Sequence, residues 1–126
     1  MIIEIFTLLV LFQIKHYLVD FVIQINDSNS IRKFDHKGWI GPLAKHAGDH
    51  SFLTFLIVYM LTQDWELGLV LAVFDFVIHF TMDRIKASPN ILGRFEYPTP
   101  PYWYSLGFDQ MVHHLTHYTI IFFIVT

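Results

Sequence analysis

Eight histidine and aspartate side chains in this sequence form pairs whose members are four residues apart. The pairs are His16 with Asp20, His46 with His50, His79 with Asp83, and Asp109 with His113. In an α-helix this spacing places both side chains on one face, about one turn apart. Helical proteins use imidazole and carboxylate groups in this arrangement to hold one divalent metal ion or two adjacent ions. These eight residues are therefore candidate metal ligands.

The ligand set limits the kind of metal site. The chain has no cysteine, which excludes disulfides, thiolate zinc sites and iron–sulfur clusters. A metal must then be held by His, Asp, Glu or water, which suits zinc, iron or manganese without distinguishing among them. A metal-free His–Asp network is an alternative. Bis-histidine haem ligation is another, although four pairs exceed what a haem needs.

Four apolar segments supply the helices that carry these pairs, over residues of about 2–25, 43–61, 67–85 and 102–125. Each is close to the roughly 20 residues that a helix needs to cross a bilayer. Hydrophobic residues make up 54% of the chain and charged residues 15%, against roughly 25% charged in an average soluble domain. We expect an all-α, polytopic integral membrane four-helix bundle that forms one domain over residues 1–126. A soluble bundle would carry a polar stripe on every helix, which these segments lack.

The distribution of basic residues predicts how the chain is oriented. Most of them lie in or beside the two long connectors: Arg32, Lys33, Lys37, Arg84, Lys86 and Arg94. The short connector 62–66 contains two acidic residues and no basic one. The protein is expected in the inner membrane of the cell. Under the positive-inside rule, the long connectors are cytoplasmic and both termini lie on the opposite, outer side of that membrane. Lys15 is the exception, and we expect its side chain to extend along the helix to the interface.

With this orientation, all four pairs lie in the cytoplasmic half of the bilayer, at two depths. The shallower layer is Asp20, His46, Asp83 and Asp109, and the deeper layer is His16, His50, His79 and His113. A charged side chain inside a bilayer costs about 2.5–3.5 kcal/mol on insertion scales, so these groups should meet in the bundle interior. Weaker candidates for supporting roles are Asp49, Asp75, Gln24, Gln110, His114 and His117, of which Asp75 could orient His79.

The order of these motifs along the chain carries a family resemblance. The motifs are His16-Tyr-Leu-Val-Asp20-Phe21-Val-Ile-Gln24, His46-x3-His50, His79-Phe80-x2-Asp83-x2-Lys86 and Asp109-Gln110-x2-His113. Over nearly the whole chain, they resemble the domain of unknown function 3307 family, which are small polytopic membrane proteins of bacteria and their phages. That family implies no established activity. It is distantly similar to a group named membrane-bound metal-dependent hydrolases for comparable intramembrane His/Asp motifs.

These features together predict a metal-dependent hydrolase whose site lies at the cytoplasmic face of the membrane. In this hypothesis Asp20, Asp83 and Asp109 are catalytic, as ligands or, where one is unligated, as the general base. The substrate is amphiphilic, such as a phospholipid or an isoprenoid phosphate, because lipid reaches a site at this depth. The basic groups expected to hold its phosphate are Lys86, Arg84 and Arg94.

Two other classes of function remain open at this point. One is a non-catalytic membrane module with a structural metal or a His–Asp network, and the other is metal or proton transport. The expected partner is the lipid bilayer. Basic residues are too few for a nucleic-acid partner, and the sequence gives no sign of the oligomeric state.

Overall fold

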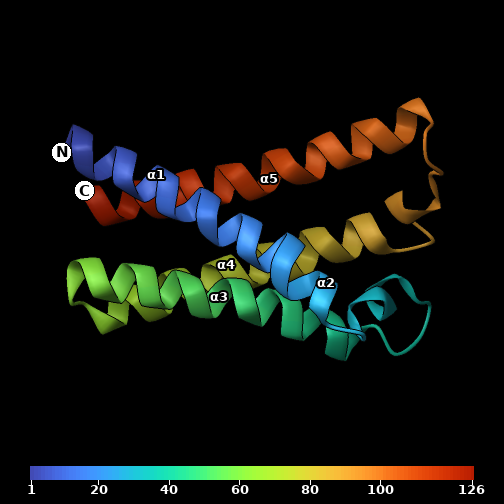
Figure 1. Ribbon diagram of the computed structural model, residues 1–126, viewed down its shortest axis with the longest axis horizontal. Coiled ribbons are helices and arrows are strands. Elements are labelled where there is room, and N and C mark those ends of the chain that lie inside the picture. Colours follow the sequence, from blue (N-terminus) through green and yellow to red (C-terminus); the bar gives the residue numbers. More distant parts are fainter.

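Four long helical segments run the length of the molecule in the computed structural model, which describes residues 1–126 (Figure 1). The first segment consists of α1 (Ile2–Tyr17), a π-helical turn η1 (Leu18–Ile23) and α2 (Gln24–Asn26). The others are α3 (Ile40–Thr62), α4 (Trp65–Ala87) and α5 (Pro100–Val125). Short 3-10 helices, η2 (Ser30–Phe34) and η3 (Leu92–Arg94), lie in the long connectors. The predicted all-α class is confirmed, and α3, α4 and α5 begin two or three residues earlier than expected.

Local sequence determines where these helices begin and end. The turn after α3 contains Gln63 with a left-handed φ of 57°. Asp64 then caps α4, because its side chain accepts a hydrogen bond of 2.9 Å from the backbone N–H of Leu67. Pro100 and Pro101 occupy the first turn of α5. Proline is tolerated there, because the N–H groups of the first turn have no hydrogen-bond acceptor within the helix.

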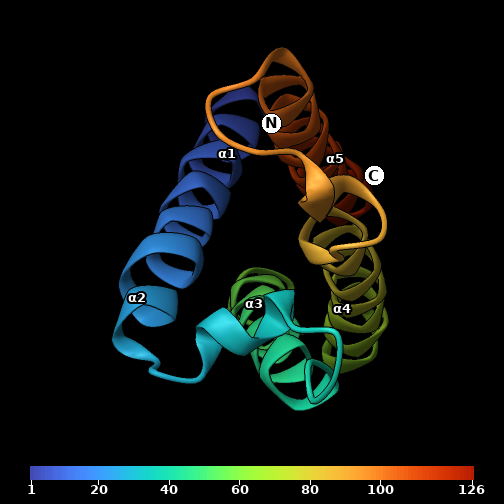
Figure 2. The ribbon, with the colours of Figure 1, turned by 90° about the vertical axis from the view of Figure 1, so that its right-hand side faces the viewer.

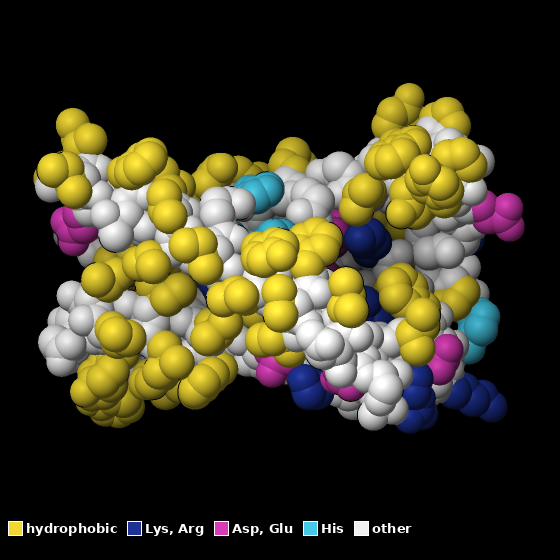
Figure 3. All heavy atoms as spheres, viewed as in Figure 1, with side chains coloured by type: hydrophobic (Ala, Val, Ile, Leu, Met, Phe, Trp, Pro, Cys, Tyr) yellow, Lys and Arg dark blue, Asp and Glu magenta, His cyan; other side chains and the backbone are white.

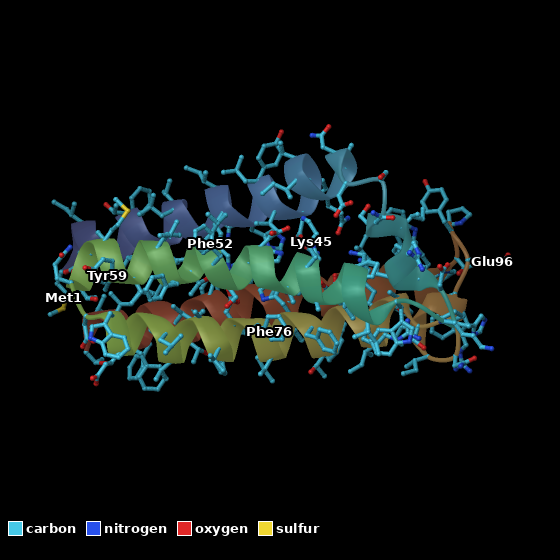
Figure 4. The ribbon with its side chains drawn as sticks, turned by 90° about the horizontal axis from the view of Figure 1, so that it is seen from below. Met1, Lys45, Phe52, Tyr59, Phe76 and Glu96 are labelled. Carbon is cyan, nitrogen blue, oxygen red and sulfur yellow. The ribbon has the colours of Figure 1, made fainter.

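The chain places both termini and the short α3–α4 turn at one end of the molecule. The two long connectors lie at the opposite end (Figures 1 and 2). Figure 4 shows the same polarity, since Met1 and Tyr59 lie at one end and Glu96 at the other. This is the arrangement that the predicted topology requires, and it brings the four His/Asp pairs to a common level.

A small apolar core fills the half of the bundle nearer the termini. Its buried members are Leu8, Phe12, Val58, Leu71, Ile120 and Ile121. In this half α3 and α4 approach closely at Gly68, which has no side chain. A Cβ added at Gly68 would lie only 3.2 Å from the Phe55 ring. Nearby, the Ser51 hydroxyl donates a 2.7 Å hydrogen bond to the backbone carbonyl of Ala72. All four His/Asp pairs lie on the other side of this core, toward the long connectors.

The interior of the bundle contains more polar than hydrophobic side chains, which is the reverse of the usual pattern in a soluble protein. Of 28 buried residues, 15 are polar or charged and 12 are hydrophobic. Large apolar side chains remain exposed along the helices and cover much of the face shown in Figure 3. Two helical segments, Ile2–Asn26 and Trp65–Arg94, are long and apolar enough to cross a membrane. The segments of α3 and α5 do not meet that test, and each carries several His and Asp residues.

Candidate metal centre

All eight predicted ligands face the bundle interior, and the structure brings them together. Seven are buried and Asp20 is partly buried. With His117 they form three groups, in each of which one ligand atom per residue lies within 4.8 Å of the others. We name them the Asp20 group (Asp20, His46, His50), the Asp83 group (Asp83, Asp109, His113) and the three-histidine group (His16, His79, His117).

Asp20 is surrounded by imidazoles from two helices. Its Oδ1 atom lies 3.1 Å from His46 Nε2 and 3.0 Å from His50 Nε2, and its Oδ2 atom lies 3.1 Å from His16 Nε2. His46 Nε2 also lies 3.2 Å from Asp83 Oδ2. His46 therefore links the Asp20 group to the Asp83 group. Asp20 itself belongs to the π-helical turn, a type of irregularity that is frequent at functional sites.

The two carboxylates of the Asp83 group differ in their partners. His113 Nε2 lies 3.1 Å from both Asp83 Oδ1 and Asp109 Oδ1. Asp109 also contacts the Lys86 ammonium at 3.2 Å and accepts a 3.1 Å hydrogen bond from the side-chain amide of Gln110. Asp83 has only histidine partners. Asp109 is thus compensated by a lysine, whereas Asp83 is not.

The three-histidine group contains ring nitrogens that have no hydrogen-bond partner. His79 Nδ1 lies 2.8 Å from Asp75 Oδ1 and 3.1 Å from the Asp75 carbonyl oxygen, which leaves His79 Nε2 unpartnered. Both nitrogens of the buried His117 and Nδ1 of His16 are also unpartnered. A carboxylate on one ring nitrogen directs the other toward a ligand, as in many metal sites. Asp75 therefore has the orienting position that the sequence predicted for it.

Lys15 does not extend to the interface, and that prediction is wrong. Its ammonium forms a 2.5 Å ion pair with Asp75 Oδ2, and the two side chains are 1% and 0% exposed. The Thr54 hydroxyl donates a 2.6 Å hydrogen bond to the same carboxylate oxygen. The physical reason is that α1 and α4 bring opposite charges together at one level, which removes the need for either to reach water.

A polar cavity of about 160 Å³ opens beside the Asp20 group and the Asp83 group, toward the long connectors. Asp20, Asp83, Asp109, Lys86 and Lys33 contribute to its wall. Burial lowers the pKa of Lys33, and the nearby carboxylates of Asp83 and Asp20 act in the opposite direction. Sequence reasoning missed Lys33 as a site residue because it lies in a connector, where no helical periodicity indicates the direction of a side chain.

The two arginines predicted to bind phosphate do not line this cavity. Arg84 donates hydrogen bonds to the backbone carbonyls of Lys33 at 3.1 Å and Asp35 at 3.2 Å, and its guanidinium lies over the Trp39 ring. Arg84 therefore anchors the connector that carries Lys33. Arg94 stacks over the ring of the following phenylalanine. Neither arginine is therefore placed to contact a ligand in this cavity, and the cavity's basic side chains are Lys33 and Lys86.

Two further candidates from the sequence lie outside the centre. His114 Nδ1 is 3.0 Å from the Gln13 side-chain nitrogen, at the outer surface. Asp49 pairs with Lys45 at 2.9 Å, one helical turn away on the exposed side of α3. Of the two extra histidines on α5, His117 therefore joins the centre and His114 does not, as the i, i+4 spacing from His113 would indicate.

The arrangement of ligand atoms fits a divalent transition metal. Among the eight predicted ligands, the carboxylate oxygens lie 3.0 to 3.2 Å from the nearest imidazole nitrogens. Ligands bound tetrahedrally at about 2.1 Å are about 3.4 Å apart, so small shifts would admit an ion. The unpartnered nitrogens of His16, His50, His79, His113 and His117 supply further lone pairs. These groups of His and Asp residues could therefore hold a metal ion.

Comparisons of the chain with protein-family models, with curated proteins and with solved structures gave no match. The resemblance to the domain of unknown function 3307 family therefore stays a prediction that rests on the motifs. The chemistry of the centre itself is therefore the basis for its function.

Proposed function

We propose that this protein is a membrane-embedded, metal-dependent hydrolase that acts on an amphiphilic, phosphorylated substrate. The observation that carries the proposal is a pair of carboxylates in the bundle that only histidines contact. Asp20 and Asp83 lie on either side of His46, and neither has a Lys or Arg nitrogen within 4.0 Å of its carboxylate. Enclosed carboxylates that no lysine or arginine contacts are costly. A zinc, iron or manganese ion held by these groups would balance the charge.

Two observations support a location in the membrane for all four helices. Polar side chains dominate the buried positions and large apolar side chains the exposed ones, including Phe52 on α3 and Phe122 on α5. A lipid environment favours this distribution, because buried polar groups must be satisfied within the bundle. We further propose, from the basic residues of the long connectors, that these connectors face the cytoplasm and both termini lie outside.

The proposed reaction is hydrolysis of a phosphate ester at the cavity wall. The bound cation supplies Lewis-acid activation of water and of the phosphoryl oxygen. The water oxygen bonds to phosphorus and the bond from phosphorus to the alcohol oxygen breaks. Asp109 accepts one proton of the water and passes it to the leaving alcohol oxygen, because its Lys86 and Gln110 partners make it the carboxylate that needs no metal for compensation.

Metal analysis and activity, measured on the same detergent-purified preparations, test this proposal. The wild-type protein should carry at least about one equivalent of zinc, iron or manganese. Asp20→Asn and Asp83→Asn should lose most of it. Asp109→Asn should keep the metal and lose hydrolysis of an alkyl phosphate by about 100-fold or more. Asp49→Asn is the control, because Asp49 pairs with Lys45 outside the centre, and it should keep both properties.

Two results would contradict the proposal in different ways. Metal content below about a tenth of an equivalent in carefully prepared protein would leave a hydrogen-bonded His–Asp network in place of a metal centre. Stoichiometric metal with no hydrolysis of any alkyl phosphate, in the wild type as in the variants, would indicate a structural metal.

A further inference from the structure

Three hollows, each sharing lining residues with the next, lie between the candidate metal centre and the outer surface. The polar cavity shares Lys86 and Leu106 with a second hollow of about 150 Å³. That second hollow shares Leu92, Phe95 and Ser105 with a groove of about 460 Å³. The groove lies where the end of α4, the η3 connector and the start of α5 meet, a region seen end-on in Figure 2.

The chemistry of the lining changes along this path. The inner cavity is lined by carboxylates, imidazoles and two lysines, whereas the outer groove is almost entirely apolar. The only hydroxyl groups in the groove lining belong to Tyr104 and Ser105. The Ser105 hydroxyl donates a 2.8 Å hydrogen bond to the Pro101 carbonyl of its own helix. The outer groove therefore suits a hydrocarbon chain, and the inner cavity suits a charged head.

We infer that the three hollows form one site for a phosphate monoester of a long-chain alcohol. This inference rests on the proposed function and specifies its substrate class. Lys33 and Lys86 stand on the cavity wall as the cations for the phosphate. Lys86 also lines the second hollow, so the hydrocarbon chain of the ligand should extend from its phosphate head into that hollow. The volume of the groove falls within the roughly 300–1,000 Å³ of typical ligand pockets.

The groove positions the chain more than it strengthens binding. A hydrocarbon chain that moves from lipid into an apolar groove exchanges one apolar environment for another, so the hydrophobic effect contributes little. Affinity should come mainly from the head, and the groove should decide where the chain lies. The test must therefore measure the position of the chain.

The experiment uses a hexadecyl phosphate with a photoreactive diazirine at mid-chain, added to the full chain in phosphatidylcholine bilayers. Crosslinks mapped by mass spectrometry should concentrate on 91–95 and 104–108. Unlabelled hexadecyl phosphate should compete at least about tenfold better than hexadecanol, because only the phosphate pairs with the lysines. Lys86→Gln should weaken that competition about tenfold, and Lys37→Gln, an exposed lysine of the first connector, should not.

A plug introduced after folding tests the groove directly. The chain has no cysteine, so Phe108→Cys and Phe123→Cys each offer a single thiol. Phe108 and Phe123 are 50% and 52% exposed on the same helix, and only Phe108 lines the groove. A bulky maleimide on Phe108→Cys should reduce the groove crosslinks about tenfold, and the same reagent on Phe123→Cys should leave them unchanged.

The outcomes separate this inference from the proposed function. Crosslinks spread evenly over the apolar faces of all helices, or equally reduced by either plug, would mean ordinary lipid contact and would overturn the inference, even in a protein that binds metal and hydrolyses the ester. Crosslinks confined to the groove in a protein without metal or hydrolysis would support the binding site and overturn the proposed function.

Discussion

The buried ion pair between Lys15 and Asp75 makes a sharp prediction about stability. We consider the substitution Lys15→Met, which keeps a similar unbranched side chain and removes the ammonium. Asp75 is then left at 0% exposure with the Thr54 hydroxyl and the His79 ring as its remaining partners. The carboxylate loses its only full positive charge, because no other Lys or Arg lies within 4.0 Å of it.

The size of the effect follows from the geometry of the pair. At 2.5 Å, and with an effective dielectric constant of about 20, the attraction between the two charges is about 7 kcal/mol before the cost of desolvation. Experiments on other buried pairs give about 3–5 kcal/mol when one partner is removed. We expect Lys15→Met to lower the free energy of unfolding by about 3–5 kcal/mol. The double variant with Asp75→Asn should recover at least about 2 kcal/mol of this, because it leaves no uncompensated charge.

The assay is reversible unfolding in mixed micelles of increasing dodecyl sulfate content, followed by circular dichroism. Thr54→Val provides a smaller step of about 1.5–3 kcal/mol, because it removes one hydrogen bond to the carboxylate. Thr116→Val is its control, since that hydroxyl is bonded only to a backbone carbonyl of its own helix, and its effect should be close to zero. A cost below about 1 kcal/mol for Lys15→Met, or a double variant less stable than either single one, would refute the electrostatic account.

Three further predictions concern the metal, the topology and the loop at the groove. His79→Ala should lose metal, whereas His114→Ala should retain it, because His79 presents an unpartnered Nε2 and His114 lies outside the centre; elemental analysis of both variants checks this. Single cysteines at Ser30 and Gln63 should react oppositely with an impermeant thiol reagent, Gln63→Cys in intact cells and Ser30→Cys only after lysis; the reverse pattern would invert the proposed orientation. Gly93→Ala should destabilise the protein by about 1–3 kcal/mol in the same unfolding assay, because a Cβ there would lie 2.5 Å from the Ala87 carbonyl oxygen; an unchanged unfolding curve would show that the connector adjusts freely.

The sequence predicted those contacts of the site that lie within one helix, because helical periodicity determines them. The i, i+4 spacing alone brings His16 to Asp20 and His113 to Asp109, because both members of each pair project from one helix face. The topology then brings the four pairs to one level. Contacts between helices, such as His46 with Asp83, need the rotation of each helix about its axis, which a single sequence does not determine.

The features that the sequence did not reveal have local causes. Lys33 reaches the cavity because Arg84 binds the connector backbone and holds it over the bundle end, a contact between distant segments. The π-helical turn around Asp20 changes the direction of side chains within a helix whose composition gives no sign of it. Lys15 is buried only because Asp75 of another helix lies opposite.

The polar centre is open toward one end of the bundle and closed toward the other, which bears on the choice between hydrolysis and transport. Beyond the Lys15–Asp75 pair, Leu8, Phe12 and Val58 fill the interior toward the termini, each at most 1% exposed. Every cavity and groove in the molecule is lined by residues on the connector side of that pair. A transport path needs polar groups or water across the whole membrane thickness. A site that is open on one side only and is lined by three carboxylates and two lysines therefore favours the proposed hydrolysis over transport.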